Sequence, residues 1–334
     1  MSPTRIYFLL LAVGFGGACG AAEREIRRTF AVTPGCELQV DAYRGNIIIT
    51  ESDRAEIEVV VGLEASAETE TEAARMLDAV RLEFGQADNR VSVVARNPRE
   101  SGLRFTWQEE QLVDLQFRIA VPRRCSVGLR VIHGSAEIGN LAGRMQVQIE
   151  HGGVSFRQID GTVDVRLGEG DLVLARCSGA VTARLLRGRI WAGTIGGRAE
   201  LRNATGDIEV MAVRHSIWAD AQVGEVRVGF APEMTGTSWV RVAAGNLHAG
   251  FHPRAACRVE ASATWGRVNS TLPLAVEAGG SGQRSLTGRL GGGGPRLQLR
   301  ASGGSVSLEE SRLMVEDEES PPVVAEKSAR LDQS

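Results

Sequence analysis

Aromatic residues, cysteine and net charge are all scarce in this chain of 334 residues. Phe, Trp and Tyr together make up 5% of it, there are 5 cysteines, and the formal net charge is −3. So small a charge argues against a protein that binds nucleic acid or membrane surfaces through overall electrostatics. The low aromatic content together with 40 glycines is typical of a repeat protein.

The start of the chain lacks an apolar run long enough to span a bilayer. Arg5 precedes an apolar run over residues 6–15, and the small residues 16–18 follow it. This arrangement is typical of a secretory signal peptide, which we predict over residues 1–22. The protein is therefore expected in the bacterial periplasm, the outer membrane or at the cell surface.

Cys19 raises the possibility of a lipid anchor. The segment Gly16-Gly17-Ala18-Cys19 resembles a bacterial lipobox, in which the cysteine is acylated, although Gly16 stands where leucine is usual. The alternative is ordinary cleavage after Ala21 or Ala22, which would remove Cys19. Both routes predict export.

Glycine recurs every nine residues through the middle of the chain, with apolar residues between, as at Val163 and Val165. Glycine adopts positive φ at little steric cost, which suits a corner after each strand. The series is broken only at His215 before Gly224 resumes it. Its earlier members are Gly134, Gly143, Gly152, Gly161, Gly170, Gly179, Gly188, Gly197 and Gly206.

The apolar positions late in each unit alternate between neighbouring units, so the full repeat is eighteen residues with two strands per coil. A single coil cannot bury its own apolar face, but coils stacked about 4.8 Å apart share a continuous core. The sequence therefore predicts an all-β fold, a single-chain β-solenoid built of nine-residue strand-turn units over residues 125–310.

A less regular N-terminal β region is predicted over residues 23–124, with strands at 57–61, 91–95 and 113–121. Thr69 followed by Glu72 is a capping-box pattern and starts one predicted helix, at about 69–84. Because solenoid ends expose strand edges and apolar core, we expect this region to cap the solenoid. The acidic, proline-containing residues 311–334 are predicted to form a disordered tail. The apolar residues of the predicted helix are Ala73, Leu77, Val80 and Phe84.

Four cysteines follow the predicted signal peptide, and export would permit disulfides among them. Cys36, Cys125 and Cys257 each open a repeat unit, but equivalent register alone does not make two of them neighbours. Cys177 shares an inward slot with isoleucines of neighbouring units and is expected to be a buried small hydrophobe. All three complete pairings remain open.

Several segments together resemble the bacterial putative-adhesin domain family, exported β-solenoid proteins largely of unknown function. They are the unit at 36–49, the repeated Gly-x-Val modules, Val268-Asn-Ser-Thr-Leu-Pro273 and Gly303-Gly-Ser-Val-Ser-Leu. The resemblance covers about residues 35–310 and rests on structural glycines and alternating valines. It implies fold and location more than adhesion, and no functional residues transfer with it.

Catalysis and metal binding find little support in the repeat pattern. A β-helical polysaccharide enzyme needs clustered carboxylates, yet no two fall on neighbouring coils within the outward rows on one face. Asp171 could approach Glu169 across a corner, and His133, His151 and Glu169 share a corner in three successive coils. We interpret these as solvated corner residues and predict no enzyme, no metal and no cofactor.

A row of basic residues is the strongest candidate for a ligand-binding surface. Guanidinium groups one coil apart repel unless matched, and they could bind acidic polysaccharide or phosphate. Pairing with the nearby carboxylates Asp164 and Glu200 is the simpler alternative. Outward tryptophans on opposite sheets could stack on a sugar or a partner. The candidates are Arg130, Arg166, Arg184 and Arg202, with Gln148 in the same row, and Trp191 and Trp218.

The sequence thus predicts a non-enzymatic, adhesin-like binding scaffold of the cell envelope that contacts an acidic polysaccharide or an envelope protein. We expect no nucleic-acid partner. We expect the protein to contact a membrane only through a lipid anchor. A polysaccharide-active β-helix enzyme and an envelope-stress signalling accessory that acts through a protein partner remain the alternatives.

Overall fold

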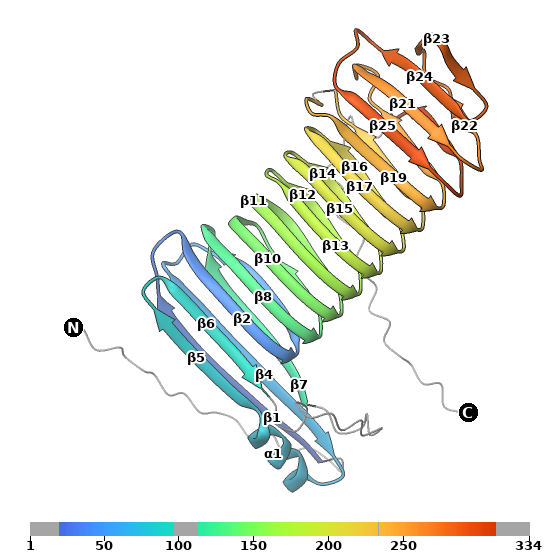
Figure 1. Cartoon of the computed structure of the whole chain (residues 1–334). Coiled ribbons are helices and arrows are strands. Elements are labelled where there is room, and N and C mark those ends of the chain that lie inside the picture. The colour runs from blue at the N-terminus through green and yellow to red at the C-terminus, as the bar shows by residue number, and fades with distance from the viewer. Residues whose placement is uncertain (1–19, 97–112, 233, 312–334) are drawn as a thin grey trace.

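The computed structural model describes residues 20–96, 113–232 and 234–311. Its central part is a stack of parallel strands in two facing rows, here called face A and face B, with the core between them (Figure 1). One long strand, β11 (Val154–Glu169), turns a corner and belongs to both faces. Face A continues with β8 (Cys125–His133), β10 (Leu141–His151), β13 (Val181–Arg187), β15 (Arg198–Thr205), β17 (Ser216–Val223) and β19 (Ser238–Ala244). Face B continues with β9 (Ala136–Ile138), β12 (Leu172–Cys177), β14 (Ile190–Ile195), β16 (Ile208–Val213), β18 (Val226–Phe230) and β20 (Leu247–Phe251).

Strand register keeps equivalent side chains in line along the stack. Val163 lies opposite Met145 on one side and Val181 on the other, and all three are buried. The residues that alternate with these along each strand point outward, as Gln146 does next to Met145. Alternation along each strand and stacking across strands therefore make one apolar core and two outward faces.

Glycine is required at the corners for two different reasons. Gly152 has a φ of +136°, and a Cβ built there would lie 1.8 Å from the carbonyl oxygen of Gly134. Gly161 at the other corner has no positive φ, yet a Cβ there would lie 1.9 Å from the oxygen of Gly143. The expectation of positive φ after every strand is therefore wrong for Gly161 and, at the same corner, for Gly179 and Gly197, where close stacking of the backbones is the constraint.

At the N-terminal end, the coil next to the solenoid comes from an earlier part of the chain than the coil beyond it. β2 (Cys36–Arg44) lies between β8 and β6 (Arg90–Arg96). On face B, β3 (Asn46–Ser52) lies between β9 and β7 (Val113–Pro122). The chain thus forms an inner coil, travels outward, and returns at β8.

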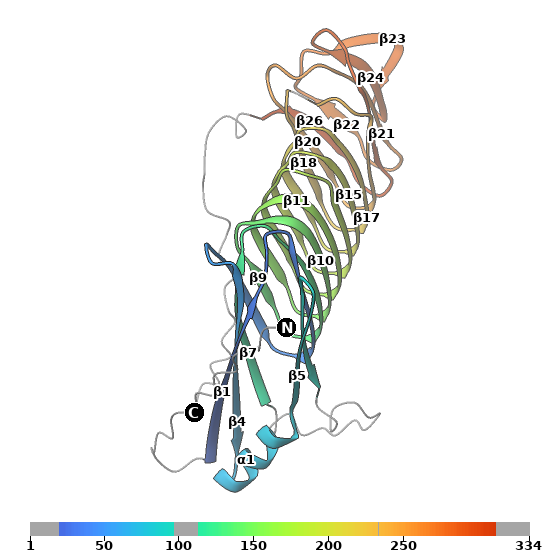
Figure 2. The ribbon, with the colours of Figure 1, turned by 90° about the vertical axis from the view of Figure 1, so that its left-hand side faces the viewer.

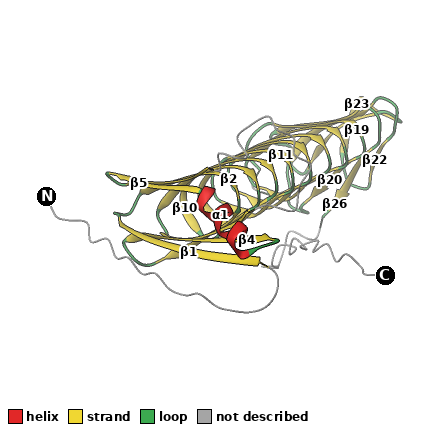
Figure 3. Cartoon of the chain, turned by 90° about the horizontal axis from the view of Figure 1, so that it is seen from below, coloured by secondary structure: helices red, strands yellow, loops and turns green. Residues whose placement is uncertain are grey.

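Antiparallel strands and the helix complete this end. β4 (Glu56–Ala67) pairs with β7 and with β1 (Gly20–Ala31), while β5 (Arg81–Ala87) pairs with β6. The helix α1 (Glu70–Ala79) lies against β1 and β4, as Figures 2 and 3 show. Its buried residues are Ala73, Met76 and Leu77.

The helix begins as predicted and ends earlier. The Thr69 side chain accepts a hydrogen bond from the Glu72 backbone N–H, which confirms the N-terminal cap. The prediction that the helix reaches about residue 84 is wrong. Val80 is already extended, and Phe84 belongs to β5, because this segment gains backbone hydrogen bonds by pairing with β6.

At the C-terminal end, too, the order of the coils in space differs from their order in the chain. β25 (Arg296–Ala301) and β26 (Val306–Glu310), the last strands of the chain, stack directly on β19 and β20. The earlier strands β21 (Cys257–Ala263) and β22 (Val268–Ser270) lie one coil farther out. The antiparallel strands β24 (Ser285–Leu290) and β23 (Ala275–Gly282) follow beyond β21.

The prediction of an all-β, solenoid-like fold is confirmed. The strands expected at 57–61, 91–95 and 113–121 lie within β4, β6 and β7. Residues 1–19, with Cys19, and residues 312–334 lie outside the described residues, so the signal peptide, the lipid anchor and the tail stay predictions. The predicted signal peptide extends to residue 22, whereas β1 already begins at Gly20 and pairs with β4. In the described part of the chain, no helix has the length and apolarity to cross a membrane.

Candidate functional site

The basic residues singled out from the sequence do lie in one line on face A. Strand register places Arg130 opposite Gln148, Gln148 opposite Arg166, and the line continues through Arg184 to Arg202. We call these five residues the arginine row. All five side chains are exposed and point outward from successive strands.

The two ends of the arginine row differ in their ion pairing. Glu200 in β15 lies 3.7 Å from Arg184 and 3.2 Å from Arg202, so one carboxylate serves two guanidinium groups. Within the described residues, Arg130 and Arg166 have no ion pair or side-chain hydrogen bond. The simpler alternative of pairing with local carboxylates therefore holds for the C-terminal half of the row only.

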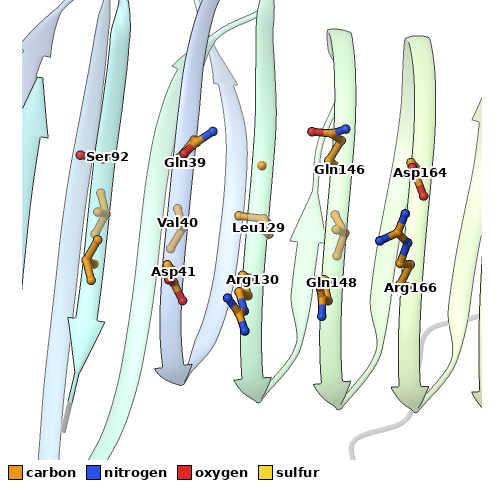
Figure 4. Close-up of a pocket in the computed structure, with 14 residues that line it drawn as sticks. Gln39, Val40, Asp41, Ser92, Leu129, Arg130, Gln146, Gln148, Asp164 and Arg166 are labelled. Atoms are coloured by element: carbon orange, nitrogen blue, oxygen red, sulfur yellow. The ribbon is translucent and has the colours of Figure 1, made fainter. Parts of the chain in front are cut away.

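A shallow groove of about 450 Å³ lies over the unpaired half of the row (Figure 4). It crosses β6, β2, β8, β10 and β11, and Gly128 of β8 deepens it because no side chain fills the space between Gln39 and Gln146. A Cβ at Gly128 would still have room, with Gln39 Cγ at 3.7 Å. The outward residues of the groove are Gln39, Asp41, Ser92, Val94, Gly128, Arg130, Gln146, Gln148, Asp164 and Arg166.

The groove offers both hydrogen-bond donors and acceptors. Asp41 is held by Arg96 at 2.5 Å, so its charge is largely compensated. Asp164 has no ion pair with any described residue and lies beside Arg166 on the same strand, as Figure 4 shows. The groove can therefore bind a carboxylate or phosphate at its guanidinium groups and hydroxyl groups at its amides.

The two candidate tryptophans lie on opposite faces, as the sequence predicts, and are half-buried. Trp191 lies on face B in line with Glu209. Trp218 on face A has both ring faces occupied: Trp239 stacks on one at 5.4 Å, and the Arg202 guanidinium lies 4.3 Å from the ring centre. Arg202 is therefore held against Trp218 by a cation–π contact.

The acidic residues near the corners have structural partners. Asp171 Oδ1 accepts a hydrogen bond of 2.7 Å from the backbone N–H of Arg189, and Asp207 Oδ1 does the same for Glu225 at 2.8 Å. Each carboxylate therefore links its corner to the next coil. Glu169 is paired with Arg187 rather than with Asp171.

The histidine corner also has the register expected from the sequence. The rings of His133 and His151 stack with centroids 4.9 Å apart, and His151 Nδ1 lies 3.3 Å from Glu169. Partial burial, Arg44 and His151 lower the pKa of His133 below its usual value, so the neutral ring is favoured. No group of three His, Cys, Asp or Glu side chains in the described residues has the arrangement of a metal site.

Sequence reasoning missed the residues that shape the site from distant segments. Gln39 and Asp41 reach the groove because β2 stacks on β8, a neighbour relation that no local pattern indicates. Trp239 was missed because the residues between β17 and β19 break the nine-residue spacing. Cys36 also lies opposite Cys125 across β2 and β8, and the only hint of this in the sequence is their equivalent position at the start of a repeat unit.

Comparisons with known proteins find distant structural similarity. No family model matches the chain, and no curated protein matches it. A putative adhesin from Bacteroides fragilis NCTC 9343 has a TM-score of 0.35 and 14% identity over 86% of this chain and 97% of that one. A putative cell adhesion protein from Clostridium sporogenes ATCC 15579 has a TM-score of 0.20 and 8% identity over 86% of this chain and 100% of that one.

A third similar structure is a putative adhesin from Parabacteroides merdae ATCC 43184, with a TM-score of 0.29 and 10% identity over 85% of this chain and 96% of that one. Two of these three structures are thus named putative adhesins and one a putative cell adhesion protein, in keeping with the sequence resemblance. At these TM-scores they assign no role to any residue of this chain.

Proposed function

We propose that this protein is an exported, non-enzymatic binding scaffold of the bacterial cell envelope, and that its groove binds a linear acidic polysaccharide. The observation that carries the proposal is the pair of guanidinium groups of Arg130 and Arg166, which have no ionic partner among the described residues. An exposed pair of guanidinium groups that form no ion pair, at the edge of a groove, is a suitable receptor for anionic groups.

The spacing of the pair suits a polymer. Arg130 and Arg166 are two strands apart, or about 9.5–10 Å at the usual strand separation. That distance is comparable to the length of a disaccharide, so a chain with one carboxylate per sugar or per disaccharide could engage both groups. Gln146 and Gln148 between them would bind hydroxyls.

The test is binding of the mature chain to polygalacturonate, with the methyl ester of the same polymer as the uncharged probe. We expect binding to the acidic polymer that weakens with salt, and weaker binding to the ester. Arg130→Ser and Arg166→Ser should each reduce affinity by tenfold or more, because a hydrogen bond to a charged group contributes about 1.5–3 kcal/mol.

The matched control removes the same charge from the other face. Arg157 and Arg176 are exposed on face B, so the variant Arg157→Ser/Arg176→Ser has the net charge of Arg130→Ser/Arg166→Ser. An equal loss of affinity in both double variants would reduce the effect to overall charge and overturn the site. Failure of the wild type to bind any acidic polymer, or cleavage of the polymer, would overturn the proposed function.

A further inference from the structure

Two of the four described cysteines face each other across neighbouring strands. Cys36 of β2 lies directly opposite Cys125 of β8, and both side chains are fully buried. The Cys125 thiol donates to the backbone oxygen of Ser126 at 3.5 Å, and the interaction between the two cysteine side chains lowers the pKa of Cys36 and raises that of Cys125. The two cysteines are therefore neighbours across adjacent strands within the core.

The backbone geometry suits a disulfide. Parallel strands lie about 4.8 Å apart, within the Cα separation of about 4.4–6.8 Å that disulfides span. Among the described residues, neither of the other two has a cysteine opposite it: Cys177 is flanked by Ile159 and Ile195, and Cys257 lies opposite Leu290. Burial raises the pKa of Cys257 to about 11, which keeps it a thiol at neutral pH.

We propose that Cys36 and Cys125 form a disulfide when the exported chain folds, and that Cys177 and Cys257 remain reduced. The proposal rests on the export stated above and is independent of polysaccharide binding. The oxidant is a dithiol–disulfide oxidoreductase of the envelope, or oxidised glutathione in vitro.

The Cys36–Cys125 bond forms by thiol–disulfide exchange in two steps. The Cys36 thiolate attacks one sulphur of the oxidant's disulfide, which breaks that bond, displaces one thiolate and leaves a mixed disulfide on Cys36. The Cys125 thiolate then attacks the Cys36 sulphur and displaces the second thiolate. Two protons leave the cysteines, and the oxidant gains two electrons as two thiols. Because both side chains are fully buried in the folded chain, the exchange takes place before β2 and β8 close over the core.

The bond would fasten the N-terminal detour to the solenoid. The chain leaves the inner coil after β3, continues in the strands farther out and returns at β8, so a bond between Cys36 and Cys125 closes this whole excursion. In the chain-entropy account, a cross-link stabilises more when it closes a longer loop. The inner coil beside the groove would then stay attached when the outer strands open.

The test maps disulfides in the mature chain after secretion into an oxidising compartment. Free thiols are blocked with N-ethylmaleimide in denaturant, and the chain is digested with trypsin without reductant. We expect the peptide 29–44 joined to the peptide 125–130, and N-ethylmaleimide on Cys177 and Cys257. N-ethylmaleimide on Cys36 and Cys125, or a link to either remaining cysteine, would overturn the proposal.

Variants give a second readout that does not depend on mapping. Wild type should melt at a lower temperature after reduction, and the Cys177→Ala/Cys257→Ala variant should keep that difference. The Cys36→Ala/Cys125→Ala variant should melt at one temperature with and without reductant. If reduction leaves the melting temperature of wild type unchanged, the cross-link is absent and the proposal fails. Polysaccharide binding measured on the same samples separates this outcome from failure of the proposed function.

Discussion

Replacing Gly152 by alanine should disrupt the stack more than any ordinary surface substitution. Gly152 has a φ of +136°, and its Cβ would lie 1.8 Å from the Gly134 carbonyl oxygen, whereas non-bonded heavy atoms attract best at about 3.5–4.0 Å. The two coils must therefore separate by well over 1 Å at this corner. That movement strains the backbone hydrogen bonds from Gly134 N–H to His151 and from Gly152 N–H to Glu169.

The cost follows from these two effects. A side chain in a backbone conformation reserved for glycine costs about 1–3 kcal/mol, and each lost hydrogen bond costs about 1 kcal/mol, so we expect Gly152→Ala to lower the free energy of unfolding by about 3–5 kcal/mol. Gly161→Ala should cost less, because only the steric conflict applies there. Gly128→Ala should be neutral or stabilising by up to about 1 kcal/mol, since its Cβ has ordinary contacts.

Urea titrations followed by circular dichroism would measure all three variants. Because repeat proteins can unfold in segments, amide hydrogen exchange at the altered corner should accompany the global measurement. The reasoning is refuted if Gly152→Ala and Gly128→Ala differ by less than about 1 kcal/mol, a difference that ordinary substitutions already produce.

Three further predictions concern single side chains. Glu200→Gln removes the carboxylate that pairs with Arg184 and Arg202 and should tighten binding of polygalacturonate several-fold without changing binding of its methyl ester, as measured by titration calorimetry. Thr69→Ala removes the helix cap and should cost about 0.5–2 kcal/mol, seen as faster amide exchange in α1 and unchanged exchange in the solenoid. Because the folded-state pKa of His133 is lowered, its contribution to stability is present above the unfolded value near 6.5 and is lost as pH falls toward the folded value. Melting temperatures of wild type should thus fall more between pH 7.5 and about 5.5 than those of His133→Gln, and equal slopes would show that other groups cause the change.

The regular part of the fold was predictable because two local rules determine it. Alternating apolar residues assign each side chain to the core or to solvent, and glycines at fixed spacing mark the corners. Together they predict from the sequence alone that Arg130, Gln148 and Arg166 lie in line, because equivalent positions in successive coils stack on one another. The same rules place Cys177 in an inward slot between Ile159 and Ile195, where the structure has it fully buried.

The order of the outer coils was not predictable, because each repeat unit specifies its own shape and not its neighbour. The units that begin at Cys36 and Cys257 have the same pattern as those in the middle. In the structure, β2 lies directly on the solenoid, while β21 lies one coil away with β25 in between. Contacts between distant segments alone decide which coil stacks on which. Every strand with this pattern has a similar edge, so the pattern itself does not select the neighbour.

The candidate site lies where one of these distant contacts occurs, which explains why the sequence located only half of it. The guanidinium groups belong to the regular stack, but Gln39 and Asp41 come from the inner coil that the N-terminal detour leaves against β8. Separation of β2 from β8 would remove one side of the groove while leaving Arg166 in place. Loss of the Cys36–Cys125 bond should therefore weaken ligand binding only under conditions that open this junction, such as moderate urea, and leave it unchanged in buffer. Weaker binding of Cys36→Ala/Cys125→Ala in buffer alone would mean that the two thiols shape the groove directly, contrary to their position in the core.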